Sequence, residues 1–482
     1  MRSPSVPPHV STARHLAGAY PFLRESELGA GGTFIGVDLL GGSFCYDPFV
    51  LYEAGLVTNP NMVVLGQIGR GKSSLVKSYL WRQSVFGRRC WVVDPKGEYG
   101  PLALACGVEP VRLEPGGSIR LNPLDDPSSY RDTGTGHAAR GGELLGRDQG
   151  LAPGGNIGHV GQAGEADEAG RVEPGVHAIL KPDTGVTFKP GRSVTPRPEE
   201  SITLRRVALL SAILTASLGR SLLPAESGAL DLAVRDAQGR HRQPVIPHVI
   251  EALFAPTFAS AAALRTEIAR LTEDGRQVAL ELRRLTAGDL RGMFDGPTSE
   301  GINMDGQVVV LDLSAIYNSP ALGILMTCAM GWLQGALERP GAERVLFVVD
   351  EAWAVLRNPG VARWLHDSWK LARARGISNI AVVHRPSDLA AVGPGDGEHM
   401  HLARGLLSDS ETRVVYAQSP GEAEMAAGLL DLTPTETEII KQLGRGIALW
   451  KVGNRSFLVR HEMVARELEI TQTDGAMKAH YQ

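Results

Sequence analysis

A glycine-rich stretch near residue 70 has the composition of a phosphate-binding loop. Its glycines let backbone N–H groups converge on phosphate oxygens, and a helix that follows would direct its positive end at the same anion. Lys72 is spaced to reach the β and γ phosphates, and the Ser73 hydroxyl to bind Mg²⁺. The sequence therefore predicts a site for ATP and Mg²⁺; the alternative is a chance match in a chain with 57 glycines. The stretch comprises Gly66, Gln67, Ile68, Gly69, Arg70, Gly71, Lys72, Ser73 and Ser74.

A pair of adjacent carboxylates, Asp350 and Glu351, follows the apolar run 344–349. A buried strand of a parallel sheet delivers the residues after it to the crevice where ligands bind. There Asp350 would hold Mg²⁺, and Glu351 would polarise the attacking water as a general base. The alternative is that both carboxylates only stabilise the N-terminus of a helix. Together with the phosphate loop, the pair favours an enzyme that hydrolyses ATP, with Lys72 and Glu351 as catalytic residues.

Strands and helices must bring these residues together. Continuously apolar runs that alternate with helical periodicity indicate an α/β fold with a mostly parallel central sheet, covered by helices on both faces. The two glycines at 41–42 predict a hairpin from Thr33–Asp38 and Ser43–Asp47. The other expected strands are 61–65, 90–94, 307–313, 344–349, 377–383 and 412–417, and the expected helices are 73–84, 202–218, 225–234, 247–253, 261–285, 321–337 and 361–374.

Residues 131–200 differ in composition from the rest of the chain. They contain 15 glycines and 6 prolines, a share of these two types that is typical of disordered sequence. We expect a mobile insertion there, with a small hairpin at 176–189. The expected divisions are an N-terminal arm and hairpin element at 1–60, an ATPase core at 61–125 and 301–465, the insertion at 126–200, an inserted all-α subdomain at 201–300 and a tail at 466–482.

Composition excludes several classes of protein. The net charge of −4 gives no general basic signature for nucleic acid, although a local channel is compatible with it. The 4 cysteines lack C-x-x-C spacing, which argues against a zinc module or a disulfide scaffold and fits a reducing cytosol. The longest apolar stretch, 321–333, is shorter than the ~18 residues of a membrane span. We therefore expect no transmembrane segment and a cytoplasmic protein.

Further segments resemble a known group of ATPases. Residues 94–99 (D-P-K-G-E-Y) resemble the segment after the second strand in the HerA–FtsK superfamily, and 121–125 (L-N-P-L-D) resemble the segment that follows it. Residues 350–353 (D-E-A-W) look like the second acidic motif in the ATPases of conjugation and type IV secretion, and the stretch 285–296 is similar to their pre-strand region. The resemblance runs from about residue 33 to 460, apart from the insertion. It implies a P-loop NTPase (RecA-like) fold and a homo-hexameric motor with sites at subunit interfaces.

The resemblance also implies roles for single residues. Glu98 would lie near the nucleotide, and His384 would stand where the group usually has a glutamine that contacts the γ-phosphate. Arg373, or else Arg375 or Arg413, would be the arginine that one subunit supplies to its neighbour's site. The alternatives are a histidine satisfied at a strand end and arginines solvated at a helix end.

Three functions remain open from the sequence. The leading one is a motor ATPase that powers conjugative DNA transfer or type IV secretion, located at the inner face of the membrane through partner proteins. The second is a HerA-like DNA translocase in DNA repair, and the third is an ATP-gated assembly scaffold with little hydrolysis. Related secretion ATPases carry a large N-terminal docking domain, whereas about 60 residues precede the phosphate loop here. We therefore expect a stand-alone motor domain.

Overall fold

The computed structural model describes residues 28, 31–39, 42–125, 198–288, 290–300, 302, 306–317, 319, 322–337, 344–356, 362, 365, 366, 369, 370, 373–387 and 404–471. The first compact unit of the chain spans Met1–Tyr130 and Pro198–Gln482, and all of the described residues belong to it. The expected N-terminal arm, almost all of the expected insertion and its hairpin at 176–189 lie outside the described residues. The fold below is that of the described part of the first unit.

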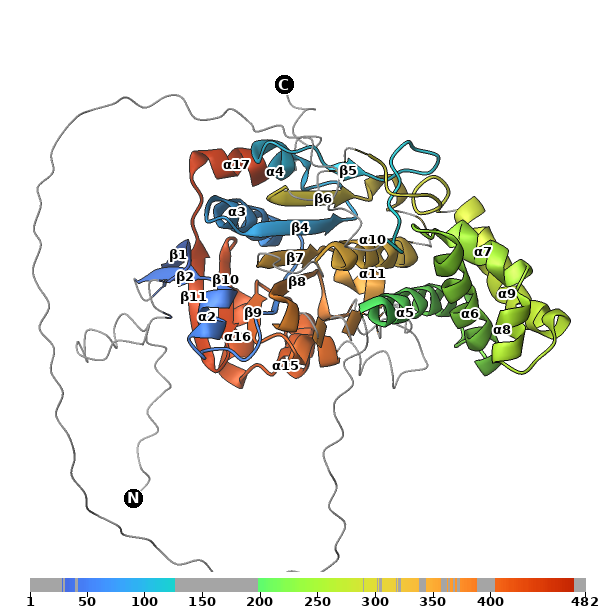
Figure 1. Ribbon diagram of the computed structural model, residues 1–482. Coiled ribbons are helices and arrows are strands. Elements are labelled where there is room, and N and C mark those ends of the chain that lie inside the picture. Colours follow the sequence, from blue (N-terminus) through green and yellow to red (C-terminus); the bar gives the residue numbers. More distant parts are fainter. Residues whose placement is uncertain are drawn as a thin grey trace, which may run out of the picture. The chain divides into compact units, whose positions relative to one another are not determined.

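An 11-stranded sheet organises this part of the chain, in the order β2-β1-β11-β10-β9-β3-β8-β7-β4-β6-β5 (Figure 1). The pairs from β9 to β5 are parallel, and those from β2 to β9 are antiparallel. The predicted α/β class with a mostly parallel sheet is confirmed. The strands are β1 (Thr33–Asp38), β2 (Ser43–Tyr46), β3 (Met62–Leu65), β4 (Arg89–Asp94), β5 (Val111–Arg112), β6 (Val308–Asp312), β7 (Val345–Val349), β8 (Ile377–Val383), β9 (Thr412–Val415), β10 (Ile447–Val452) and β11 (Arg455–His461).

The register of the parallel strands aligns their carboxyl ends. Leu65 at the end of β3 pairs with Val383 at the end of β8. Val349 at the end of β7 pairs with Ala381 of β8 on one side and with Val93 of β4 on the other. The residues that follow β3, β4, β7 and β8 therefore emerge at one edge of the sheet, as ligand-binding residues do in open parallel sheets.

The antiparallel part of the sheet is larger than the sequence indicated. The predicted hairpin of β1 and β2 is present, and β1 pairs with β11 rather than ending the sheet. Strands β10 and β11 form a second hairpin that turns at Gly453, whose φ of +56° favours glycine. These two strands were not predicted, because β11 alternates between buried and exposed positions and so lacks a continuous apolar run.

Helices cover both faces of the sheet. Because side chains alternate along a strand, Val64 and Val92 join one buried cluster with α3, α4 and α17, whereas Val63 and Trp91 join another with α10 and the helices before it. The helices are α2 (Pro48–Glu53), α3 (Lys72–Val85), α4 (Gly100–Ala105), α5 (Pro198–Leu218), α6 (Pro224–Arg240), α7 (Ile246–Phe254), α8 (Phe258–Ala263), α9 (Ile268–Ala287), α10 (Leu322–Leu337), α11 (Ala352–Leu356), α15 (Pro420–Leu430), α16 (Pro434–Gln442) and α17 (Ala465–Thr471), with short 3-10 turns η2 (Ser314–Ile316) and η3 (Arg373–Arg375).

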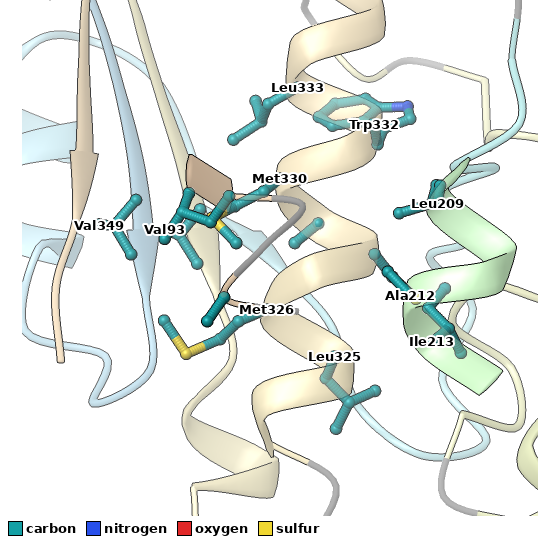
Figure 2. Close-up of a cluster of buried hydrophobic side chains, with 14 of the residues drawn as sticks. Val93, Leu209, Ala212, Ile213, Leu325, Met326, Met330, Trp332, Leu333 and Val349 are labelled. Carbon is teal, nitrogen blue, oxygen red and sulfur yellow. The ribbon is translucent and has the colours of Figure 1, made fainter. Parts of the chain in front are cut away.

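Helix α10 joins the sheet to the helical block of α5 to α9. Figure 2 shows its side chains between Val93 and Val349 of the sheet and Leu209 and Ile213 of α5. The helices are closely packed there, since a Cβ on Gly331 of α10 would lie 2.8 Å from a methyl carbon of Leu209. By length and composition, one helix of the described residues, 200–218 within α5, could cross a membrane, and 39% of it is buried in the fold.

Two expected helices differ from the structure. The single helix predicted at 261–285 is wrong, because α8 ends at Ala263 and α9 begins at Ile268. Arg265 between them has a φ of +52°, a conformation that no helix accommodates. The helix predicted at 361–374 lies largely outside the described residues, and its last positions belong to the 3-10 turn η3.

Candidate active site

The phosphate loop is the connection between β3 and α3. Gly69 and Gly71 have φ values of +77° and +114°, which only glycine adopts without strain. Gly71 is the N-cap of α3, and no side chain caps the N–H groups of the first turn. These N–H groups are donors that α3 itself cannot satisfy, so they suit an anion. Gly66 must also be small, because a Cβ there would lie 2.5 Å from Cβ of Tyr416.

Lys72 lies inside this loop and is 3% exposed. Its ammonium donates to the carbonyl oxygens of Gly66 and, at 3.0 Å, of Gln67. The two carbonyl oxygens thus accept hydrogen bonds from the Lys72 ammonium that phosphate oxygens would accept if a nucleotide were bound. Burial lowers the pKa of Lys72 to about 8, against the opposing effect of Asp350 and Glu351. The charges of the two carboxylates that the sequence paired with Lys72 therefore act on its ammonium.

Asp350 follows β7 directly and is 4% exposed. Its backbone N–H donates to Val93 at 3.3 Å, and its Oδ1 accepts from the N–H of Glu351 at 2.8 Å. Burial, with the nearby charge of Glu351, raises its pKa to about 6. A carboxylate kept close to its protonated form by burial gains most from a bound cation.

Magnesium fits this donor set. In the described part of the chain, no group of three or more histidines, cysteines and carboxylates could hold a metal by itself. Mg²⁺ is bound in many nucleotide sites by one or two protein oxygens together with phosphates and water. Asp350 and the Ser73 hydroxyl, on the first turn of α3, would be those protein oxygens.

Glu351 has an unusual backbone and a crowded carboxylate. Its φ is +53°, in the left-handed region that non-glycine residues seldom adopt outside functional sites. The side chain is 1% exposed, and its Oε1 forms an ion pair with Lys96 and a hydrogen bond, at 2.5 Å, with Nε2 of His384. Its Oε2 accepts from Nε1 of Trp353. Burial would raise the pKa of Glu351, but His384 and Lys96 outweigh it and lower the pKa to about 2.

His384 follows β8, so the sheet brings it to Glu351 as the alignment of strand ends requires. Its Nε2 also lies 3.0 Å from Nζ of Lys96. Its Nδ1 is buried and has no hydrogen-bond partner among the described residues. A buried ring nitrogen without a partner is uncommon in a folded protein, and the contact that the resemblance implied for His384 stays a prediction.

The loop after β4 adds residues that sequence reasoning missed. Glu98, which the sequence singled out, pairs with the fully buried Nζ of Lys77 at 3.6 Å. Asp94 accepts three backbone N–H groups of its own loop, and burial raises its pKa to about 7. Lys96 contacts Glu351 directly. All of these except Lys77 lie in the D-P-K-G-E-Y segment, so the segment itself was the available signal.

The candidate arginines are not at this edge of the sheet. Arg373 is exposed on η3, immediately before β8, and its Nη1 donates to the carbonyl oxygen of Thr58 at 3.4 Å. Arg373 therefore lies before the first residue of β8, whereas His384 and the site follow its last residue, at the opposite end of the strand. Arg375 lies on the same turn. Arg413 of β9 is bound internally, because it donates to the carbonyl oxygen of Leu430 at 2.7 Å.

Comparison with solved structures finds this architecture elsewhere. VirB4 of Thermoanaerobacter pseudethanolicus is 19% identical, with a TM-score of 0.63 over 92% of this chain and 100% of that one. The bacterial conjugative coupling protein TrwB, in its ΔN70 form, is 13% identical, with a TM-score of 0.52 over 91% of this chain and 90% of that one. This chain shares its fold with both. No model of a protein family matches the sequence, and no curated protein sequence does.

Proposed function

We propose that this chain is a motor ATPase that binds Mg-ATP at Gly66–Ser74 and hydrolyses it. The observation that carries the proposal is the shared edge of the sheet. Lys72, Asp350 and Glu351 lie there around a glycine loop whose helix N-terminus has no side-chain cap, and His384 contacts Glu351. This set matches the parts that phosphoryl transfer needs.

In the proposed reaction, Lys72 and the N–H groups of α3 bind the phosphates, while Asp350 and Ser73 hold Mg²⁺. When bound there, Mg²⁺ would neutralise charge that develops on the phosphate oxygens. Glu351 accepts a proton from water as the water oxygen attacks the γ-phosphorus. The bond to the β-γ bridging oxygen breaks, so that ADP and phosphate are released.

The motor is proposed to act in conjugative DNA transfer or type IV secretion. The support is the fold shared with VirB4 and the coupling protein TrwB over about nine tenths of this chain, together with the D-P-K-G-E-Y and D-E-A-W segments. Partners of this function would be DNA and a membrane complex, which the chain would meet at the inner face of the membrane.

A homo-hexamer with shared sites is part of the proposal. Arg373 is exposed at the end of the strands opposite to the phosphate loop of its own chain. A charge at that end of the strands is far from its own nucleotide, so in the proposed hexamer Arg373 would act on the loop of a neighbouring subunit. We favour Arg373 over Arg413, because Arg413 is bound to carbonyl oxygens within its own chain.

The first test is ATP hydrolysis against protein concentration, with and without single- and double-stranded DNA. A rate per subunit that rises with concentration and again with DNA supports an oligomeric DNA motor. A flat rate that ignores DNA favours a protein-secretion ATPase, and ATP binding with negligible turnover favours the scaffold. Lys72→Ala should abolish nucleotide binding or reduce turnover at least ~100-fold. Near-normal turnover of this variant contradicts the whole assignment.

A matched control is Lys441→Met. Lys441 lies on the surface of α16, where it pairs with Glu424 at 2.8 Å and with Glu438 at 2.6 Å. Its loss removes a lysine of the same charge whose ion-pair partners are these two glutamates and not groups of the phosphate loop. Turnover of this variant should equal that of the unmodified protein, so a loss in Lys72→Ala alone assigns the effect to the site.

A further inference from the structure

Lys96 is the basic residue closest to the proposed catalytic base. Its ammonium forms an ion pair with Oε1 of Glu351, lies 3.0 Å from Nε2 of His384, and stands 5.8 Å from the centre of the Tyr317 ring. Asp350 and Glu351 are both buried. Within the ion pair, 1% of the Glu351 side chain is exposed, whereas 25% of the Lys96 side chain is exposed. Lys96 is therefore the partner in this pair that has access to the site from outside.

The base of the Lys96 side chain is held firmly. Asp94 at the end of β4 accepts the N–H of Lys96 at 3.1 Å, of Gly97 at 2.9 Å and of Tyr99 at 2.8 Å. Gly97 has a φ of +71°, and a Cβ there would lie 3.0 Å from the Ser314 side chain. This loop fixes where the lysine begins, so only its flexible aliphatic chain is free to redirect the ammonium.

Donors contact both carboxylate oxygens of Glu351, and Oε1 carries two of them. Lys96 and His384 take Oε1, and Trp353 donates to Oε2. A carboxylate acts as a general base only when one of its oxygens is within hydrogen-bond reach of the attacking water. In the arrangement seen here, Lys96 and His384 fill Oε1, so water reaches that oxygen only after one of them moves away.

We propose that Lys96 is a positioning residue that restrains Glu351 while no nucleotide is bound and releases it when the phosphates of ATP draw the ammonium away. The inference rests on the proposed function. In it, Lys96 of the D-P-K-G-E-Y segment couples the binding of ATP to the release of Glu351 as a general base. The backbone N–H of Asp350 donates to Val93, so the loop that carries Lys96 begins beside the proposed Mg-ATP site, and phosphates bound there would attract the Lys96 ammonium.

Linkage between the two residues gives a direct test. If ATP must break the Lys96–Glu351 pair, then Glu351→Gln removes an obstacle to binding only when Lys96 is present. Binding of the non-hydrolysable analogue AMP-PNP with Mg²⁺ is measured by calorimetry for the unmodified protein, Glu351→Gln, Lys96→Met and the double variant. The tightening caused by Glu351→Gln should be about tenfold greater with Lys96 than in the K96M background, equivalent to ~1.4 kcal/mol of coupling.

Equal tightening in both backgrounds shows that only the charge of Glu351 matters, and it overturns the proposal. Lys96→Arg should keep the coupling because it keeps a cation, whereas Lys441→Met should change neither binding nor coupling. Absence of AMP-PNP binding in the unmodified protein refutes the proposed function itself, which is a different outcome from binding without coupling.

A second measurement needs no nucleotide. The thermal midpoint of the four proteins is compared without nucleotide or Mg²⁺. Lys96→Met should lower the midpoint, because it leaves the buried Glu351 without that cation, and adding Glu351→Gln should recover part of the loss. Strictly additive effects of the two substitutions show that the pair does not restrain Glu351, and they also overturn the proposal.

Discussion

Asp350→Asn should stabilise the protein at neutral pH when nucleotide and Mg²⁺ are absent. Burial and the charge of Glu351 raise the pKa of Asp350 from 3.8 to about 6. This difference of roughly 2 pKa units, at ~1.36 kcal/mol each, corresponds to about 3 kcal/mol that the ionised carboxylate costs the folded state. Asparagine has the same shape and no charge, and its Oδ1 can still accept the N–H of Glu351. The ionised carboxylate of Asp350 thus lowers the free energy of unfolding, and in the proposed function it is needed to hold Mg²⁺.

The sign of the pH dependence follows from the raised pKa. Between about pH 4 and pH 6 the folded protein holds a proton on Asp350 that the unfolded chain releases, so the stabilising contribution of that proton is lost as pH rises through 6. The variant and the unmodified protein should therefore be almost equally stable near pH 4. Above pH 7 the variant should be more stable by about 3 kcal/mol, which shifts the thermal midpoint upward by several degrees.

The assay is urea and thermal unfolding in EDTA at pH 4.5, 6 and 7.5, with both proteins in parallel. Asp231→Asn is the control, since Asp231 is an exposed partner of Arg235 on one helix and should show no such trend. A stability difference that does not change with pH, or an Asp350→Asn variant that is less stable at pH 7.5, refutes the reasoning. The variant should also lose Mg²⁺-dependent nucleotide affinity, measured by calorimetry.

Three further predictions concern the same site. Glu351→Gln should bind ATP and release phosphate at least ~100-fold more slowly, because an amide takes no proton from water; an unchanged rate shows that Glu351 is not the base. Arg373→Ala should spare nucleotide binding and reduce turnover, and mixing it with Lys72→Ala protein should restore part of the activity if the arginine acts on a neighbour. Gly66→Ala should weaken nucleotide binding and cost about 1–3 kcal/mol of stability, measured by calorimetry and urea unfolding, because the new Cβ would lie 2.5 Å from Cβ of Tyr416.

Arg413→Ala is the control for the mixing experiment. Arg413 donates to carbonyl oxygens of its own chain, so its loss should lower stability and give no rescue on mixing. If Arg373→Ala behaves in the same way, Arg373 has a local structural role. For Gly66, the control is an alanine at the exposed position Gly421 in the first turn of α15, which meets no atom within 4 Å and should leave affinity unchanged.

Local chemistry made much of this protein predictable. Six of the parallel-sheet strands were expected within about two residues, because strands buried on both faces must be apolar throughout. The phosphate loop was predictable because its glycines and Lys72 follow each other in the chain, so no folding is needed to see them together. The position of Glu351 followed from the apolar strand before it. The roles of Glu98, His384 and Arg373 stay predictions, although their places are now known.

Only the tertiary structure decided which residues meet. Lys96, Glu351 and His384 come from segments as far apart as 288 positions in the chain, and the register of β4, β7 and β8 brings them into contact. The sequence does not indicate that pairing. The chain contains many lysines and many carboxylates, and nothing in their order along the chain shows which of them meet in the fold. For a similar reason, the sequence did not predict the antiparallel strands β10 and β11 or the break between α8 and α9 at Arg265. Their stability comes from partners across the sheet and within the helical block, and periodicity along one segment does not report on partners in another.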